Sequence, residues 1–151
     1  MKKVIFIMGI AILSLCATAC KTQNKAESIN NSSTTTSELT EKYWKLIELF
    51  GNPIVAENNA NEAHIIFKAE GDQFNGSTGC NRFSGTYQIE KPDRITFSQA
   101  VSTRMMCLNM DTENRFLEVI NTANSYVVRN DTLSLNRARM APLARFVAVY
   151  L

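Results

Sequence analysis

The sequence predicts a mainly β (α+β) domain, built as a curved antiparallel sheet or a partly closed small barrel with one covering α-helix. Two observations lead to this fold class. Short runs of β-branched and aromatic residues alternate with turn residues from about residue 40 to the end of the chain. Only one segment places its apolar residues at helical spacing, and one helix among about eight strands is too few for βαβ alternation.

The predicted strands lie between clusters of turn residues. They are residues 43–49, 63–69, 74–77, 85–90, 94–97, 125–129, 132–136 and 143–151. Hairpin turns are expected at Gly71-Asp72, at Lys91-Pro92-Asp93 and at Asn130-Asp131, where residues that favour turns interrupt the apolar runs. Neighbouring strands are therefore expected to pair as antiparallel hairpins.

The predicted helix covers residues 110–124. Its apolar residues recur at helical spacing, and they are Phe116, Leu117, Ile120 and Ala123. The opposite, polar face is predicted to carry Glu113, Asn114, Arg115, Glu118 and Asn121. Asp111 is the expected N-cap and Asn124 the expected stop.

The N-terminal residues have the pattern of a bacterial lipoprotein signal. Lys2 and Lys3 form a positive n-region, and residues 4–15 form an apolar h-region too short to span a bilayer. Residues 17–19 are small and directly precede Cys20, which resembles a lipobox. We expect residues 1–19 to be a signal peptide and Cys20 to carry the lipid, with an ordinary cleaved signal peptide as the alternative.

Residues 20–39 are expected to form a disordered tether, because they are polar and rich in Ser, Thr and Asn. The folded domain is then residues 40–151, which is long enough for one core. Removal of Lys2 and Lys3 with the signal peptide reduces the 16 basic residues to 14, which balances the 14 acidic residues. A near-neutral exported chain gives no reason to expect nucleic-acid binding.

Several motifs resemble the META domain, also called the HslJ family. Gly79-Cys80-Asn81 with Gly85 and Tyr87 forms one signature, and Thr103-Arg104-Met105 with Cys107 forms the second. The resemblance extends over most of residues 42–151. It implies a small β-rich domain of bacterial envelope lipoproteins and secreted proteins, associated with heat shock, novobiocin resistance and, in some parasites, motility or virulence. It implies no enzymatic activity.

Cys80 and Cys107 are the only thiols that remain once Cys20 is lipidated. In an oxidising compartment such a pair favours a disulfide, and two separate buried thiols are the alternative. A catalytic Cys80 would need a base, and His64, the only histidine, lies in a predicted strand where an outward position explains it. Two cysteines and one histidine are too few for a zinc site, so we expect no metal and no cofactor.

The glycine-rich stretch around Cys80 is interpreted as architecture. A phosphate-binding loop would precede a helix, whereas the residues after Gly79 lead into a strand. Gly76, Gly79 and Gly85 are expected to allow positive φ or a bulge, and Asn81 is expected to bond backbone groups within the turn.

Three arginines are candidates for contact with a partner or an anion. Arg104 lies beside Met105-Met106, and Arg137 and Arg139 precede Met140 in a basic C-terminal stretch. A structural ion pair for Arg104 and a solvated loop for Arg137–Met140 remain as alternatives.

These residues favour a non-catalytic, monomeric, lipid-anchored envelope protein. We expect it to reach the membrane through the lipid on Cys20, at the periplasmic face of the outer membrane, and to bind an unknown envelope protein or peptide. A thiol or redox enzyme that uses Cys80 is the second hypothesis, and a purely structural spacer is the third.

Overall fold

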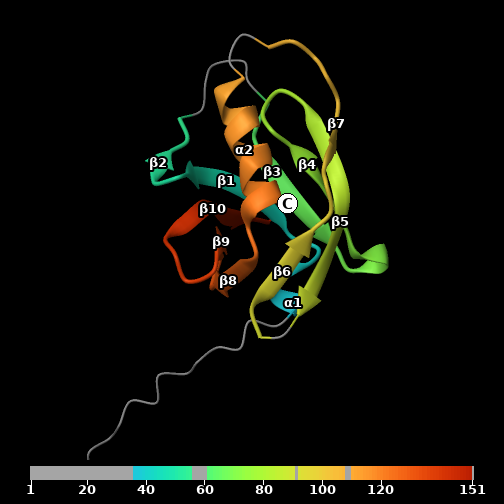
Figure 1. The fold of residues 1–151 in the computed structure, drawn as a ribbon, viewed down its shortest axis with the longest axis vertical. Helices are drawn as coiled ribbons and strands as arrows, with labels where there is room; N and C mark the ends of the chain where they lie inside the picture. Colours follow the sequence, from blue (N-terminus) through green and yellow to red (C-terminus); the bar gives the residue numbers. More distant parts are fainter. Residues whose placement is uncertain (1–35, 56–60, 91, 108–109, 151) are drawn as a thin grey trace, which may run out of the picture. The chain divides into compact units, whose positions relative to one another are not determined.

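A computed structural model describes residues 36–55, 61–90, 92–107 and 110–150 (Figure 1). The expected signal peptide, the expected lipidation site Cys20 and the expected tether up to residue 35 lie outside the described residues. The elements, in chain order, are α1 (Thr36–Leu39), β1 (Tyr43–Leu49), β2 (Asn52–Pro53), β3 (His64–Lys68), the 3-10 helix η1 (Glu70–Asp72), β4 (Gln73–Ser77), β5 (Arg82–Glu90), β6 (Arg94–Phe97), β7 (Val101–Ser102), α2 (Asp111–Thr122), β8 (Ser125–Arg129), β9 (Thr132–Asn136) and β10 (Pro142–Val149).

Eight strands close into an antiparallel barrel, which is more complete than the partly closed sheet expected from the sequence. Around the ring the order is β1, β10, β9, β8, β6, β5, β4 and β3, and the pairing of β1 with β10 closes it. The two short strands lie off this ring, with β2 beside β1 and β7 beside β5. The joint between β6 and β8 is the shortest in the ring, with the single residue pair Arg94 and Ser125.

A bulge in β1 explains how this strand keeps its apolar side chains inside. Trp44, Leu46 and Leu49 are all buried, although the last two are three residues apart and would face opposite sides in a regular strand. The pairing of β1 with β10 shifts register between Leu46 and Glu48. The extra residue leaves both Ile47 and Glu48 outside the core and returns Leu49 to it.

The barrel core is aromatic. Phe74 packs edge-on against Phe97 with ring centroids 5.4 Å apart, and Phe67 packs edge-on against Tyr87 at 5.2 Å. Gly85 lies directly opposite Phe74, and a Cβ at Gly85 would approach the Phe74 ring within 2.5 Å. The glycine therefore provides room for the aromatic side chain on the neighbouring strand.

Helix α2 lies across the barrel. The ring of Phe116 is 5.1 Å from that of Phe83 on β5 and 5.6 Å from that of Phe146 on β10. These two strands lie on opposite sides of the eight-membered ring. A side chain that reaches both must cover an opening of the barrel, so the expectation of a covering helix is met.

Two details of this helix differ from the sequence prediction. The N-cap is Met110 rather than Asp111, which lies in the first turn and forms an ion pair with Arg115 at 3.0 Å. Glu113, expected on the polar face, is buried. Glu113 lies three residues before Phe116, so the two share the inward side of the helix.

The folded region also begins earlier than residue 40. Leu39, at the end of α1, is fully buried, and its carbonyl oxygen accepts a hydrogen bond of 2.8 Å from the indole Nε1 of Trp44. Residues 36–39 therefore belong to the domain and not to the tether, because their apolar end contributes to the core.

Candidate functional site

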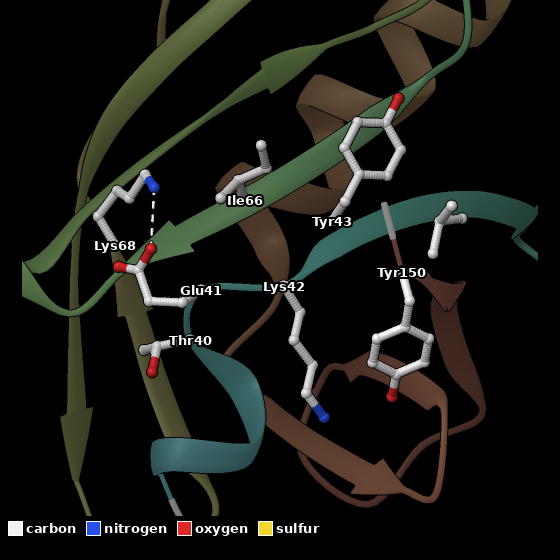
Figure 2. A pocket seen from close by; sticks show the side chains of 8 residues that line it. Thr40, Glu41, Lys42, Tyr43, Ile66, Lys68 and Tyr150 are labelled. Atoms are coloured by element: carbon white, nitrogen blue, oxygen red, sulfur yellow. Dashed lines mark hydrogen bonds and ion pairs between the residues drawn. The ribbon is translucent and has the colours of Figure 1, made fainter.

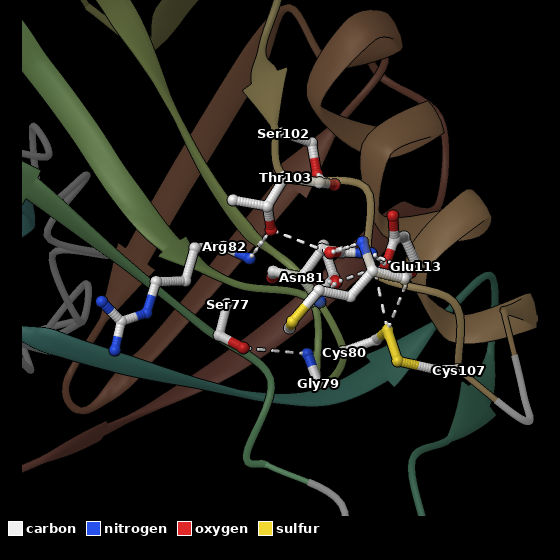
Figure 3. The surroundings of a disulfide bond; sticks show 11 residues. Ser77, Gly79, Cys80, Asn81, Arg82, Ser102, Thr103, Cys107 and Glu113 are labelled. Carbon is white, nitrogen blue, oxygen red and sulfur yellow. Dashed lines mark hydrogen bonds between the residues drawn. A yellow bond between two sulfur atoms is a disulfide. The ribbon is translucent and has the colours of Figure 1, made fainter.

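A cluster of hydrogen-bonded polar groups, buried at Thr78, Asn81 and Glu113, links the loop before β5 to the segment before α2 (Figure 3). We call it the Asn81 cluster. Its side chains are those of Thr78, Asn81, Thr103 and Glu113, and it includes the backbone of Met105. Buried polar groups stabilise a fold only when their hydrogen bonds are made, so the contacts of this cluster decide its role.

Asn81 is fully buried and uses both ends of its side-chain amide. Its Oδ1 accepts hydrogen bonds from Thr103 Oγ1 at 2.8 Å and from the Met105 amide at 2.7 Å. Its Nδ2 donates to the Met105 carbonyl at 3.1 Å and to Glu113 Oε2 at 2.8 Å. The Asn81 side chain therefore bonds both the amide and the carbonyl of Met105, as the backbone of a neighbouring strand would.

Glu113 provides the acceptor at the centre of this arrangement. Its Oε2 accepts from Asn81 Nδ2 and from Thr78 Oγ1, the latter at 3.0 Å. The side chain is only 6% exposed. Helix α2 is thus tied through its first turn to the loop that precedes β5.

A disulfide lies beside the cluster. It joins Cys80 to Cys107, whose Cα atoms are 6.2 Å apart, in agreement with the pairing expected from the sequence. Cys80 Sγ lies 3.7 Å from the Met105 carbonyl oxygen and 3.4 Å from Asn81 Nδ2. The disulfide and Asn81 therefore restrain the same segment from two sides.

The restrained segment presents apolar side chains to solvent. Val101 is 73% exposed, Met105 is 56% exposed and Met106 is 99% exposed. Arg104, between them, is exposed as well. We call residues 101–106 the Met106 platform, because a backbone held by buried groups carries an exposed apolar surface.

The structure does not bring Arg104 together with Arg137 and Arg139. Met105 lies beside Glu113 in the first turn of α2, whereas the Ala138 amide bonds the Asn124 side chain just beyond the last turn, at 2.6 Å. The intervening length of helix is about 16 Å at 1.5 Å per residue. In Figure 1 the β9–β10 turn likewise lies on the other side of α2 from the segment after β7. The three arginines therefore form two separate surfaces.

Two open grooves lie on the outer face of the barrel. The first has a volume of about 570 Å³ (Figure 2) and is lined by Thr40, Glu41, Lys42, Tyr43, Ile66, Lys68, Val149 and Tyr150. The second, of about 580 Å³, is lined by His64, Asn75, Gly76, Ser77, Arg82, Phe83, Ser84, Val101, Ser102 and Thr103. The stacked rings of Tyr43 and His64 connect the two, with centroids 4.3 Å apart.

The charges around this stack are largely paired. In the first groove Lys68 Nζ lies 2.9 Å from Glu41 Oε2, and this hydrogen bond lowers the pKa of Glu41. Glu62 forms an ion pair with Lys45, which lowers the pKa of Glu62. Burial, together with a hydrogen bond to Glu62, raises the pKa of Tyr43 to about 12.

His64 has a structural setting. Its ring stacks on Tyr43, and its Nδ1 lies 3.0 Å from the Glu62 carbonyl oxygen. Cys80 is bonded to Cys107, so the free thiol that the enzyme hypothesis requires is not present in this state. Among the described residues, no group of three or more His, Cys, Asp or Glu side chains is placed to hold a metal ion.

The glycines around Cys80 shape the backbone, as expected, but not all of them in the expected way. Gly79 has a φ of +96°, as the prediction of positive φ requires, but Gly76 and Gly85 lie within strands. Asn81 does not stay within its turn, because its amide reaches Met105, 24 residues further along the chain. Neither Thr78 nor Glu113 was identified from the sequence as a member of the site. The position of Glu113, three residues before the core residue Phe116 on the same helix, could have indicated that it faces inward.

The fold and the site define a small closed β-barrel domain in which a disulfide and a buried amide fix a loop against a helix. A family model described as META domain matches residues 37–150. The chain therefore belongs to the META domain family. A search of curated proteins found no match.

Solved structures share this fold. One, described only as an NMR structure of a protein, is 25% identical, with a TM-score of 0.60 over 76% of this chain and 94% of the other. An NMR structure from Burkholderia xenovorans is 17% identical, with a TM-score of 0.56 over 75% and 85% of the two chains. A crystal structure of a DUF4847 family protein from Bacteroides vulgatus ATCC 8482 is 18% identical, with a TM-score of 0.56 over 74% and 94%. The last two likenesses concern the fold alone.

Proposed function

We propose that this META-domain protein is a lipid-anchored envelope protein that binds a protein or peptide partner through the Met106 platform and catalyses no reaction. The observation that carries the proposal is the double restraint of an exposed apolar segment. A segment that is already ordered loses little conformational entropy when a partner binds. Methionine and arginine are also enriched at protein interfaces.

The anchor and the physiological role rest on the sequence. The small residues before Cys20 support lipidation, and the resemblance to envelope proteins associated with heat shock and antibiotic resistance supports a role in stress tolerance. Within the part of the chain that the structure describes, no helix is both long and apolar enough to cross a membrane. The proposed link to the membrane is the lipid on Cys20.

The partner surface is tested by site-specific photo-crosslinking in intact envelopes. A crosslinker at Met106 should capture a discrete partner, and one at Met140, in the separate Arg137–Met140 loop, should not. Arg104→Gln and Met105→Ser should reduce capture at least about tenfold, since each removes a platform contact. Arg129→Gln is the matched control, because Arg129 is exposed and lies at the end of β8.

Two results would overturn this assignment. Equal capture by the Arg104→Gln variant and the unmodified protein would exclude the platform. If only the crosslinker at Met140 captured a partner, the binding surface would be the Arg137–Met140 loop instead. Folding of each variant is monitored by the fluorescence of Trp44, the only tryptophan.

The anchor and the thiol hypothesis are tested together by the intact mass of membrane-extracted protein after alkylation, with and without reductant. We expect a lipid mass on Cys20 and no alkylation of Cys80 or Cys107 before reduction. A Cys80 that is alkylated in the folded, unreduced protein would restore the thiol or redox enzyme as the leading hypothesis. An unlipidated mass would indicate a secreted protein.

A further inference from the structure

The second outer groove is built from aligned polar side chains on four strands. His64 pairs with Ser77 and Ser77 with Arg82, so these three residues form one row across β3, β4 and β5. Asn75, Ser84 and Val101 form a second row across β4, β5 and β7. Adjacent strands are about 4.8 Å apart, so His64 and Arg82 lie about 10 Å apart at opposite ends of their row.

Arg82 gives the groove its charge. Figure 3 shows its side chain extending away from the Asn81 cluster. Its backbone is fixed, because its amide donates to Thr103 Oγ1 at 3.1 Å and its carbonyl accepts from the Thr103 amide at 3.0 Å. Within the described residues, its guanidinium forms no ion pair.

The rest of the lining favours an anion. None of the ten lining residues is acidic. The nearby carboxylate of Glu62 is neutralised by Lys45, and this ion pair lowers the pKa of Glu62. A guanidinium without a competing carboxylate is suited to bind a carboxylate or phosphate through two parallel hydrogen bonds.

Neutral hydrogen-bonding groups surround this charge. They are the amide of Asn75 and the hydroxyls of Ser77, Ser84 and Ser102. A backbone carbonyl only accepts, so the contact with the Glu62 carbonyl oxygen places a proton on His64 Nδ1 and leaves Nε2 as the nitrogen available to a ligand. Val101 is the only aliphatic side chain in the lining.

This chemistry fits a sugar acid better than a peptide. Side-chain amides and hydroxyls match the hydroxyl groups of a sugar ring, whereas a bound peptide would need apolar pockets or an extended free strand edge. The groove volume of about 580 Å³ lies within the range of small-ligand sites. We propose that the groove binds a short uronic-acid oligosaccharide, with Arg82 on a carboxylate and with Asn75 and Ser84 on ring hydroxyls.

This site differs in chemistry from the Met106 platform, although Val101, Ser102 and Thr103 belong to both. The protein–partner interaction and the sugar-acid site can therefore succeed or fail independently. A partner captured at Met106 would neither support nor oppose the sugar-acid proposal.

The test is titration of the mature full-length chain with trigalacturonate, followed by NMR chemical shifts and calorimetry. Trigalacturonate should bind with shifts at the groove residues, and its neutral methyl ester should bind at least about tenfold more weakly because the charge-assisted contact is lost. Arg82→Gln should cause a similar loss, Ser84→Ala a loss of about two- to fivefold, and the matched control Arg129→Gln no change.

Each other outcome would overturn the proposal. Equal binding of the methyl ester, or unchanged binding by Arg82→Gln, would exclude recognition of the carboxylate. Inorganic phosphate binding as tightly as trigalacturonate would mean a simple anion site. Tighter binding of triglutamate would mean a peptide site, and no binding of trigalacturonate up to its solubility limit would leave the groove without this ligand class. Ser84→Ala keeps the test valid should Arg82→Gln fail to fold.

Discussion

Asn81 joins three parts of the chain through one side chain. It bonds the Thr103 hydroxyl, both backbone groups of Met105 and the carboxylate of Glu113. Because Asn81 and Glu113 are buried, loss of the Asn81 amide removes a hydrogen bond from Glu113 in a low dielectric and removes both partners of the Met105 backbone. Residues of this kind stabilise a local conformation more than their number of contacts suggests.

Replacement of Asn81 should therefore be costly. Asn81→Ala is expected to lower the free energy of unfolding by about 3 kcal/mol, since four hydrogen bonds are lost, one of them to the buried Glu113. Asn81→Asp should be at least as damaging near neutral pH, because a second carboxylate would face Glu113 and the amide donors would be lost. Urea unfolding followed by Trp44 fluorescence measures both.

Acid distinguishes these two variants. Protonation of the carboxyl introduced at position 81 restores a donor towards Glu113, so Asn81→Asp should regain stability relative to Asn81→Ala as the pH falls towards about 4. A constant difference between the two variants across this range would contradict the role assigned to the Asn81–Glu113 contact.

Tyr87 predicts how the domain responds to alkali. Its hydroxyl donates to the Lys68 carbonyl at 2.9 Å, and burial raises the pKa of Tyr87 to about 12. Since the unfolded value is near 10, its contribution to stability is complete below pH 10 and is lost as the pH rises through 12. We expect unfolding to become easier in this window, together with the appearance of tyrosinate absorbance.

Tyr87→Phe provides the comparison. It should cost about 1 kcal/mol at neutral pH through loss of the hydrogen bond, and it should reduce the alkaline decline. Tyr43, whose pKa is also raised to about 12, remains in the variant, so part of the decline should persist. An unchanged alkaline profile would show that Tyr87 is not a main contributor.

At the scale of elements, the loop between β7 and α2 has two independent restraints. The disulfide closes a loop between residues 27 positions apart, and Asn81 holds Met105 without any covalent bond. The chain-entropy relation gives the disulfide a contribution of about 3.5 kcal/mol. These two restraints should be separable by experiment.

The free energy of unfolding of the double variant Cys80→Ser/Cys107→Ser is expected to be about 2 to 4 kcal/mol lower than that of the oxidised protein. The Met105 amide should still be protected in hydrogen exchange, because its acceptor is Asn81 Oδ1. Full loss of Met105 protection in a variant that remains folded would mean that the disulfide alone orders the platform.

The sequence predicts the bounds of single strands and of the helix better than the contacts between them. The bounds of β1, β6, β8 and β9 agree with the periodic runs from which they were expected, because each run is bounded by strong turn residues. Helix α2 was placed within two residues at each end. Strand β5 begins three residues before its predicted start, since Phe83 and Ser84 pair with the short strand β7, which the sequence did not predict.

The candidate site was predicted only in part. The cysteine pair follows from counting thiols, but Glu113 was assigned to the polar face because a charged residue is normally exposed. Its burial depends on Asn81 and Thr78, which lie more than thirty positions earlier in the chain. The separation of Arg104 from Arg137 and Arg139 depends on where α2 packs, which local patterns do not encode.

At the scale of the whole domain, Leu39 shows where the folded unit begins. Leu39→Ala is expected to lower the free energy of unfolding by about 2 to 4 kcal/mol, as for other fully buried leucines. A chain that begins at residue 40 should be destabilised at least as much, because it also loses the carbonyl that accepts from Trp44 Nε1. A red shift of Trp44 fluorescence would report the change, and a truncated chain as stable as the full one would place the boundary at residue 40.

The pairing of β1 with β10 also determines when the domain can fold. Tyr43 lies opposite Val149, so the seam joins positions about 100 residues apart and cannot form until the last strand has been synthesised. A ribosome-bound or translocating chain must therefore keep the apolar face of β1 unpaired until its end emerges. If the two ends were linked and the chain opened at Asn130-Asp131, this long-range seam would become a local hairpin, and refolding followed by stopped-flow fluorescence should be faster.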